Sequence, residues 1–84
     1  MTNEQLKNIV IEMLGWYGMA AVFGAYAMTT LGYIAPGGMA ANLLNLTGAV
    51  GIVVVTVKHK AWPSAVLNML WTIIGLVGIA RLLM

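Results

Sequence analysis

Residues 39–57 read MAANLLNLTGAVGIVVVTV, an uncharged stretch that stops at the basic cluster Lys58, His59 and Lys60. A helix needs about 20 apolar residues to cross the hydrocarbon core of a bilayer, so this stretch is long enough to span one. Its valines would also suit a strand, but unpaired strand edges are prohibitive in lipid and a barrel strand would alternate in polarity. The stretch therefore predicts a transmembrane helix.

Two similar stretches flank this one. Residues 9–34 contain a single Glu, and residues 63–83 contain a single Arg. The first helix is expected to start early, because residues 2–5 read TNEQ and can form a helix cap, and to end at the Pro-Gly-Gly sequence of residues 36–38. We predict an all-α membrane protein, a compact bundle of three transmembrane helices in one domain, residues 1–84, with helices at about 5–34, 39–57 and 63–83.

The composition agrees with this class. The 84-residue chain is 62% hydrophobic and 7% charged, whereas about a quarter of the residues of a soluble domain are charged. Cysteine is absent, which excludes disulfides and thiolate metal sites, and one His cannot form a metal site alone. The cations are scattered, so nucleic acid is not expected as a partner. A cleaved signal peptide is disfavoured because the first apolar stretch is too long for one. The lipid bilayer is the expected surrounding.

The cations also predict an orientation. Three crossings place Lys7, Lys58 and Lys60 at one membrane surface and Arg81 at the other. Cytoplasmic segments carry an excess of Lys and Arg, so the N-terminus is expected inside and the C-terminus outside.

Small residues recur in all three stretches. Helices in lipid associate through close backbone approach, which glycines at helical spacing permit. Helix packing is the first interpretation, and hinges for a gating movement are the alternative. The glycines assigned to packing are Gly15, Gly18, Gly24, Gly48, Gly51, Gly75 and Gly78.

Polar residues at membrane depth are the candidate functional groups. Polar side chains there are costly without partners, so they must face protein or a cavity. One interpretation is a hydrogen-bonded clamp between helices, for example from Asn45 to Asn68. The other is a pocket for a neutral polyhydroxylated or heteroaromatic solute, since amides donate and accept and an indole offers a flat apolar face. The pocket candidates are Asn45, Asn68, Trp71, Asn42, Tyr26 and Thr72.

Glu12 is the only carboxylate within a predicted span. An ionisable group in a membrane is a functional candidate by default, and proton coupling is one role. Because Glu12 lies near the surface that carries Lys58 and Lys60, a salt bridge is the other. His59 is expected to be solvated.

Residues 42–71 carry a resemblance. The sequences NLLNLTGA, AWPS and LNMLW, which follow one another there, resemble a group of small uncharacterised bacterial membrane proteins labelled permeases, which implies the bacterial inner membrane. A distant similarity is to the SemiSWEET half-transporters, which have three helices and an Asn in the third, where Asn68 would match. The Pro-Gln pair of that family is absent from the first helix here.

Motifs of enzymes are missing, so neither catalysis nor a cofactor is expected. Three helices enclose no solute pathway, but two parallel copies would supply six. The first hypothesis is therefore a half-sized permease or channel that acts as a parallel homodimer, with alternating access around its polar residues. The second is an accessory subunit of a larger membrane complex. The third, a holin-like pore former, is disfavoured because a highly charged tail is missing.

Overall fold

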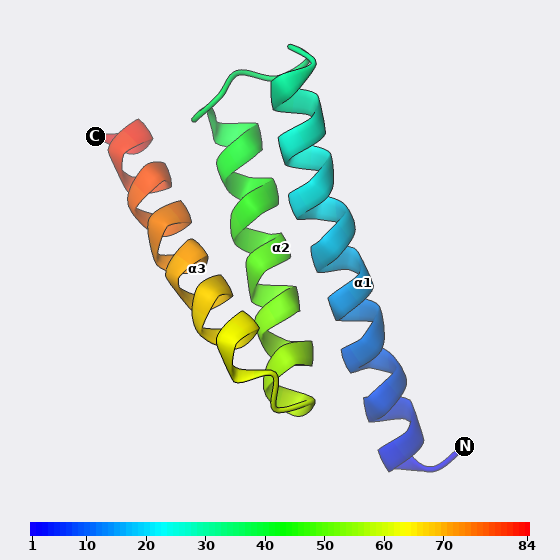
Figure 1. Ribbon diagram of the computed structural model, residues 1–84. Helices are drawn as coiled ribbons and strands as arrows, with labels where there is room; N and C mark the ends of the chain where they lie inside the picture. Colours follow the sequence, from blue (N-terminus) through cyan, green and yellow to red (C-terminus); the bar gives the residue numbers. More distant parts are fainter.

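The computed structural model describes all 84 residues as three helices without strands. Helix α1 covers Asn3–Thr30, α2 covers Met39–Lys58 and α3 covers Trp62–Leu83 (Figure 1). Each helix is long and apolar enough to cross a membrane, as expected of a multi-pass membrane protein. The predicted three-helix transmembrane architecture is confirmed.

Helix α1 starts at a capping box. The Thr2 hydroxyl accepts the Gln5 amide at 3.1 Å, and the Gln5 side chain accepts the Thr2 amide at 3.0 Å. These two bonds occupy donors that the first turn of a helix leaves without partners. The early start that residues 2–5 predicted is therefore confirmed.

The end of α1 differs from the prediction. The helix stops at Thr30, before the Pro-Gly-Gly sequence, because Gly32 takes a left-handed φ of +86°. The Gly32 amide donates to Thr29 at 3.2 Å, and the Tyr33 amide donates to Met28 at 2.8 Å. This bonding pattern is typical of a helix that ends at a glycine. Helix α1 therefore ends about one turn before the predicted end near Pro36.

The turn between α2 and α3 closes in the same way without a glycine. Lys60 holds the left-handed position at φ +58°. The Lys60 amide donates to Val57 at 3.1 Å, and the Ala61 amide donates to Thr56 at 2.8 Å. Pro63 then lies in the first turn of α3, where its missing N–H leaves no helical bond unmade.

Helix α2 lies between the other two. It packs against α1 on one side and against α3 on the other, while no Cα atom of α1 lies within 8 Å of α3. The bundle measures 44 × 22 × 22 Å. The chain therefore forms a row of three helices in which only α2 has two neighbours, as Figure 1 shows.

Glycines set the close approach of α1 to α2. A methyl group added at Gly18 would overlap the Gly48 carbonyl oxygen, and one added at Gly51 would overlap the Leu14 carbonyl oxygen. The packing role is thus visible at these positions, and also at Gly15, which faces Val55. Gly24 is the exception, since nothing lies within 4 Å of an added methyl group there. Gly24 therefore makes no close contact within the chain, and its assignment to helix packing stays a prediction.

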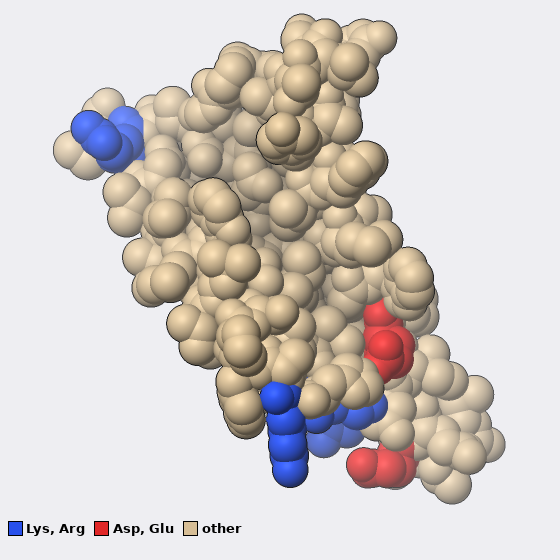
Figure 2. All heavy atoms as spheres, in the orientation of Figure 1, with Lys and Arg blue, Asp and Glu red and all other residues tan.

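Charges gather at the two ends of the bundle (Figure 2). The N-terminus and the α2–α3 turn lie at one end, and the C-terminus lies at the other (Figure 1). At the first end the Lys58 ammonium donates to Asn8 at 2.6 Å. Because Asn8 lies level with the end of α2, the first turns of α1 extend beyond the other helices.

Candidate functional site

A groove of about 290 Å³ lies over α2, with α1 along one side and α3 along the other. Its floor comes from the first half of α2 and one end from the loop between α1 and α2. The groove exists because α1 and α3 do not meet above α2. Its lining residues are Val22, Ala25, Tyr26, Thr29, Pro36, Gly37, Ala41, Asn42, Asn45, Ala49, Asn68 and Trp71.

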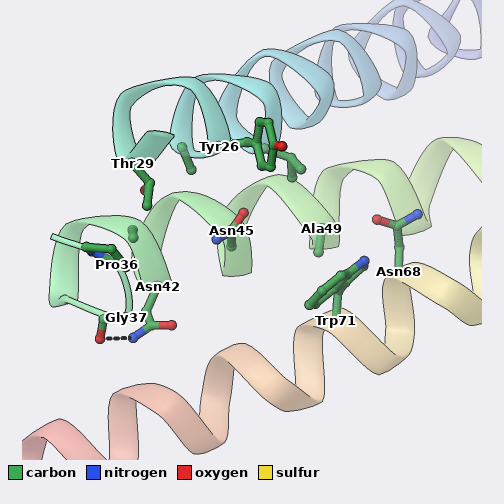
Figure 3. Close-up of a pocket in the computed structure, with 12 residues that line it drawn as sticks. Tyr26, Thr29, Pro36, Gly37, Asn42, Asn45, Ala49, Asn68 and Trp71 are labelled. Carbon is green, nitrogen blue, oxygen red and sulfur yellow. Dashed lines mark hydrogen bonds between the residues drawn. The ribbon is translucent and has the colours of Figure 1, made fainter. Parts of the chain in front are cut away.

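Five of the six pocket candidates line this groove. Asn45 comes from the floor, Tyr26 from α1 and Trp71 from α3, and Figure 3 shows these three around one space. The side chain of Asn45 makes no hydrogen bond within the chain, so its amide is available to a ligand. No lining residue carries a charge.

The other two amides are already partly engaged. Asn42 Nδ2 donates to the Gly37 carbonyl at 3.0 Å, which ties α2 to the preceding loop. Its amide also packs against Gly78 of α3, where an added methyl group would lie 2.9 Å from Asn42 Oδ1. Asn68 Nδ2 donates to the Ser64 carbonyl at 2.9 Å within α3. Asn42 is thus mainly a structural residue, whereas Asn68 keeps its oxygen free.

The expected clamp from Asn45 to Asn68 does not form. Asn68 bonds within its own helix, and Asn45 bonds to nothing. Instead, α1 and α2 are joined by the Tyr17 and Thr47 hydroxyls, 2.8 Å apart. The Thr47 hydroxyl also donates to the Leu43 carbonyl of its own helix. A threonine can always make that bond, so the sequence does not reveal that Thr47 has a partner on another helix.

Thr72 does not line the groove. Its hydroxyl donates to the Asn68 carbonyl at 2.8 Å, which satisfies it inside α3. The sequence reading also missed Thr29, which lines the groove beside Tyr26. The signal was present, because residues 22, 25, 26 and 29 follow the spacing of one helix face.

Glu12 lies at the other end of the molecule. Its carboxylate is 2.6 Å from His59 Nε2, in the turn between α2 and α3. Both side chains are about half exposed in the single chain, and the Glu12 carboxylate is paired with the His59 ring. The salt-bridge interpretation of Glu12 agrees with this contact, while His59 has a partner where solvation alone was expected.

Residues 11–84 match the sequence model of a protein family whose function is uncharacterised. The whole groove lies within the matched residues. No curated protein and no solved structure matches the chain.

Proposed function

We propose that the chain, which belongs to the uncharacterised family that residues 11–84 match, is a half-sized permease or channel for a small uncharged molecule. It acts as a homo-oligomer, with a parallel dimer favoured. It resides in the bacterial inner membrane with its N-terminus inside, the orientation that the excess of Lys at that end favours.

The observation that carries the proposal is the unbonded amide of Asn45 in an uncharged groove. A carboxamide at the depth of a membrane span is costly unless it gains a partner. Helix packing does not use the Asn45 amide, because α2 meets α1 through glycines and the hydroxyl pair of Tyr17 and Thr47 and meets α3 through other side chains. The Asn45 amide, which makes no hydrogen bond within the chain, is therefore available to bind a solute.

The need for more than one copy follows from the row arrangement. A pathway across the membrane must be enclosed by protein, and three helices in a row enclose nothing. A second parallel copy supplies three more helices and, by symmetry, a second groove.

Reconstitution into liposomes tests the proposal. Liposomes are transferred into an isotonic solution of glycerol, the uncharged probe, and swelling is followed by light scattering. Liposomes that contain the protein are expected to swell faster than empty ones. Asn45→Ala should lower the swelling rate by about fivefold, as expected for loss of one hydrogen bond to the solute. Asn3→Ala, outside the groove, is the matched control and should leave the rate unchanged.

Native mass spectrometry from mild detergent reports the copy number of the same samples. A discrete dimer supports the proposal. A monomer that gives no swelling contradicts it and favours an accessory subunit of a larger membrane complex.

A further inference from the structure

The lining of the groove restricts the kind of molecule that can bind. Its polar groups are three carboxamides, two hydroxyls and one indole N–H, all uncharged, and the remaining lining is mostly aliphatic. A charged ligand group would lose its water without gaining a counter-charge, which is strongly unfavourable. A small polyol such as glycerol can bond the amides but leaves most of the apolar lining unmatched. The lining suits a molecule with a small uncharged polar head and a larger apolar part.

In the single chain, the side of the groove between α1 and α3 is open. No contact joins α1 to α3 above the floor, and the rim residues Tyr26 and Trp71 are 72% and 51% exposed. Trp71 comes from the middle of α3, and Tyr26 lies one turn before the end of α1. One end of the groove is lined by Pro36 and Gly37 of the connecting loop. In one copy of the chain, the opening therefore runs along the side of the helices that are long enough to span a membrane.

We propose that the natural ligand is an uncharged amphiphile that enters sideways from the bilayer. Its hydroxyl or carbonyl head bonds the free amide of Asn45, and its apolar tail leaves the groove between Tyr26 and Trp71 into the lipid. The inference rests on the proposed function, since it takes the groove as the substrate site and defines the class of substrate.

Fluorescence of Trp71 tests this directly. The variant Trp16→Phe/Trp62→Phe leaves Trp71 as the only indole, because the chain has three Trp. It is placed in phosphatidylcholine vesicles that contain a small fraction of either brominated diacylglycerol, with a neutral hydroxyl head, or phosphatidylcholine brominated at the same acyl positions. We expect diacylglycerol to quench Trp71 about fivefold more effectively, the preference that one hydrogen bond gives.

Two matched variants test whether the preference for diacylglycerol arises in the groove. Asn45→Ala in the same background should make the two brominated lipids equally effective. A protein with Trp62 as its only indole, made by Trp16→Phe/Trp71→Phe, should be quenched equally by both, because Trp62 lies at the start of α3 outside the groove. Circular dichroism confirms that each variant keeps its helices.

Equal quenching of Trp71 by both lipids in the protein that keeps Asn45 overturns the inference, since bulk lipid then fills the groove. A Tyr26→Cys variant provides a second test, because the natural chain has no Cys. A disulfide between two copies of this variant would overturn the inference as well, because a second chain would then cover the opening. If glycerol swelling persists, either of these two results leaves the proposed function standing and removes only the amphiphile as ligand. If swelling is absent but diacylglycerol still quenches Trp71 selectively, the proposed transport is contradicted and the amphiphile site is not.

Discussion

Helix α2 meets α1 through glycines that touch backbone and through side-chain hydrogen bonds, whereas it meets α3 through side chains that pack against Gly75 and Gly78. An added methyl group at Gly18 or Gly51 would overlap backbone of the facing helix. One at Gly75 or Gly78 of α3 would meet side chains of α2, at 3.3 Å from Leu46 Cβ and 2.9 Å from Asn42 Oδ1. Tyr17 bonds Thr47 across the first interface, and no side-chain hydrogen bond joins α2 to α3. The first interface is close and specific, and the second is looser.

This difference explains where the groove lies. Backbones that touch leave no room for a ligand, so α1 and α2 form a fixed pair. Helix α3 is held at fewer points and leaves its Asn68 and Trp71 beside the free amide of Asn45. If the protein changes shape during transport, movement of α3 against the α1–α2 pair disrupts the fewest contacts.

Filling the interface between α1 and α2 should have the largest effect on stability. Gly18→Ala should lower the free energy of unfolding by about 2 kcal/mol, because the methyl group overlaps backbone that cannot move aside cheaply. Titration of the micellar protein with sodium dodecyl sulfate, followed by circular dichroism, measures this. Gly24→Ala, with open space around it, is the matched control. Equal stability of the two variants would contradict a glycine-dependent interface.

The three amides should separate into structural and functional residues. Asn42→Ala should cost about 1 kcal/mol of unfolding free energy, because it removes the bond to Gly37 and the contact with Gly78. Asn45→Ala, in the same titration, should change stability by less than about a third of that, since its side chain bonds nothing. A loss at Asn45 as large as that at Asn42 would show that Asn45 is structural.

The hydroxyl pair should contribute less to the first interface than its glycines do. Tyr17→Phe should lower the free energy of unfolding by about 0.6 kcal/mol, a typical value for a hydrogen bond between membrane helices. Tyr26→Phe removes a hydroxyl without a partner and serves as the control. Both variants are measured in the same detergent titration. An equal change in their unfolding free energies would show that the hydroxyl pair does not stabilise this interface.

The pair of Glu12 and His59 should have the smallest effect. Glu12→Gln should lower the unfolding free energy by no more than about 0.5 kcal/mol, because both members of the pair are partly exposed and water screens them. Glu4→Gln, which has no partner, is the comparison. Glycerol flux in liposomes should be unchanged by Glu12→Gln, and a large loss would support the proton-coupling role instead.

Sequence reasoning reached much of the candidate site. Asn45, Asn68 and Trp71 were identified because polar or indole groups inside apolar spans are conspicuous. Thr29 was missed because Tyr26 shares helical spacing with several sets of residues, and the groove uses the set that contains Val22, Ala25 and Thr29. Only the position of α2 could choose among these sets.

The three helices, their approximate limits and the helix ends that share a membrane surface follow from local properties of the sequence, since apolar length, caps and turn residues act within one stretch of chain. The packing of the helices against one another places α2 in the middle, leaves Gly24 without a neighbour in the chain, brings Glu12 to His59 and leaves the Asn45 side chain without a hydrogen bond. Those outcomes depend on which helix faces are neighbours, and apolar residues on every side of a membrane helix leave that choice to close packing between backbones.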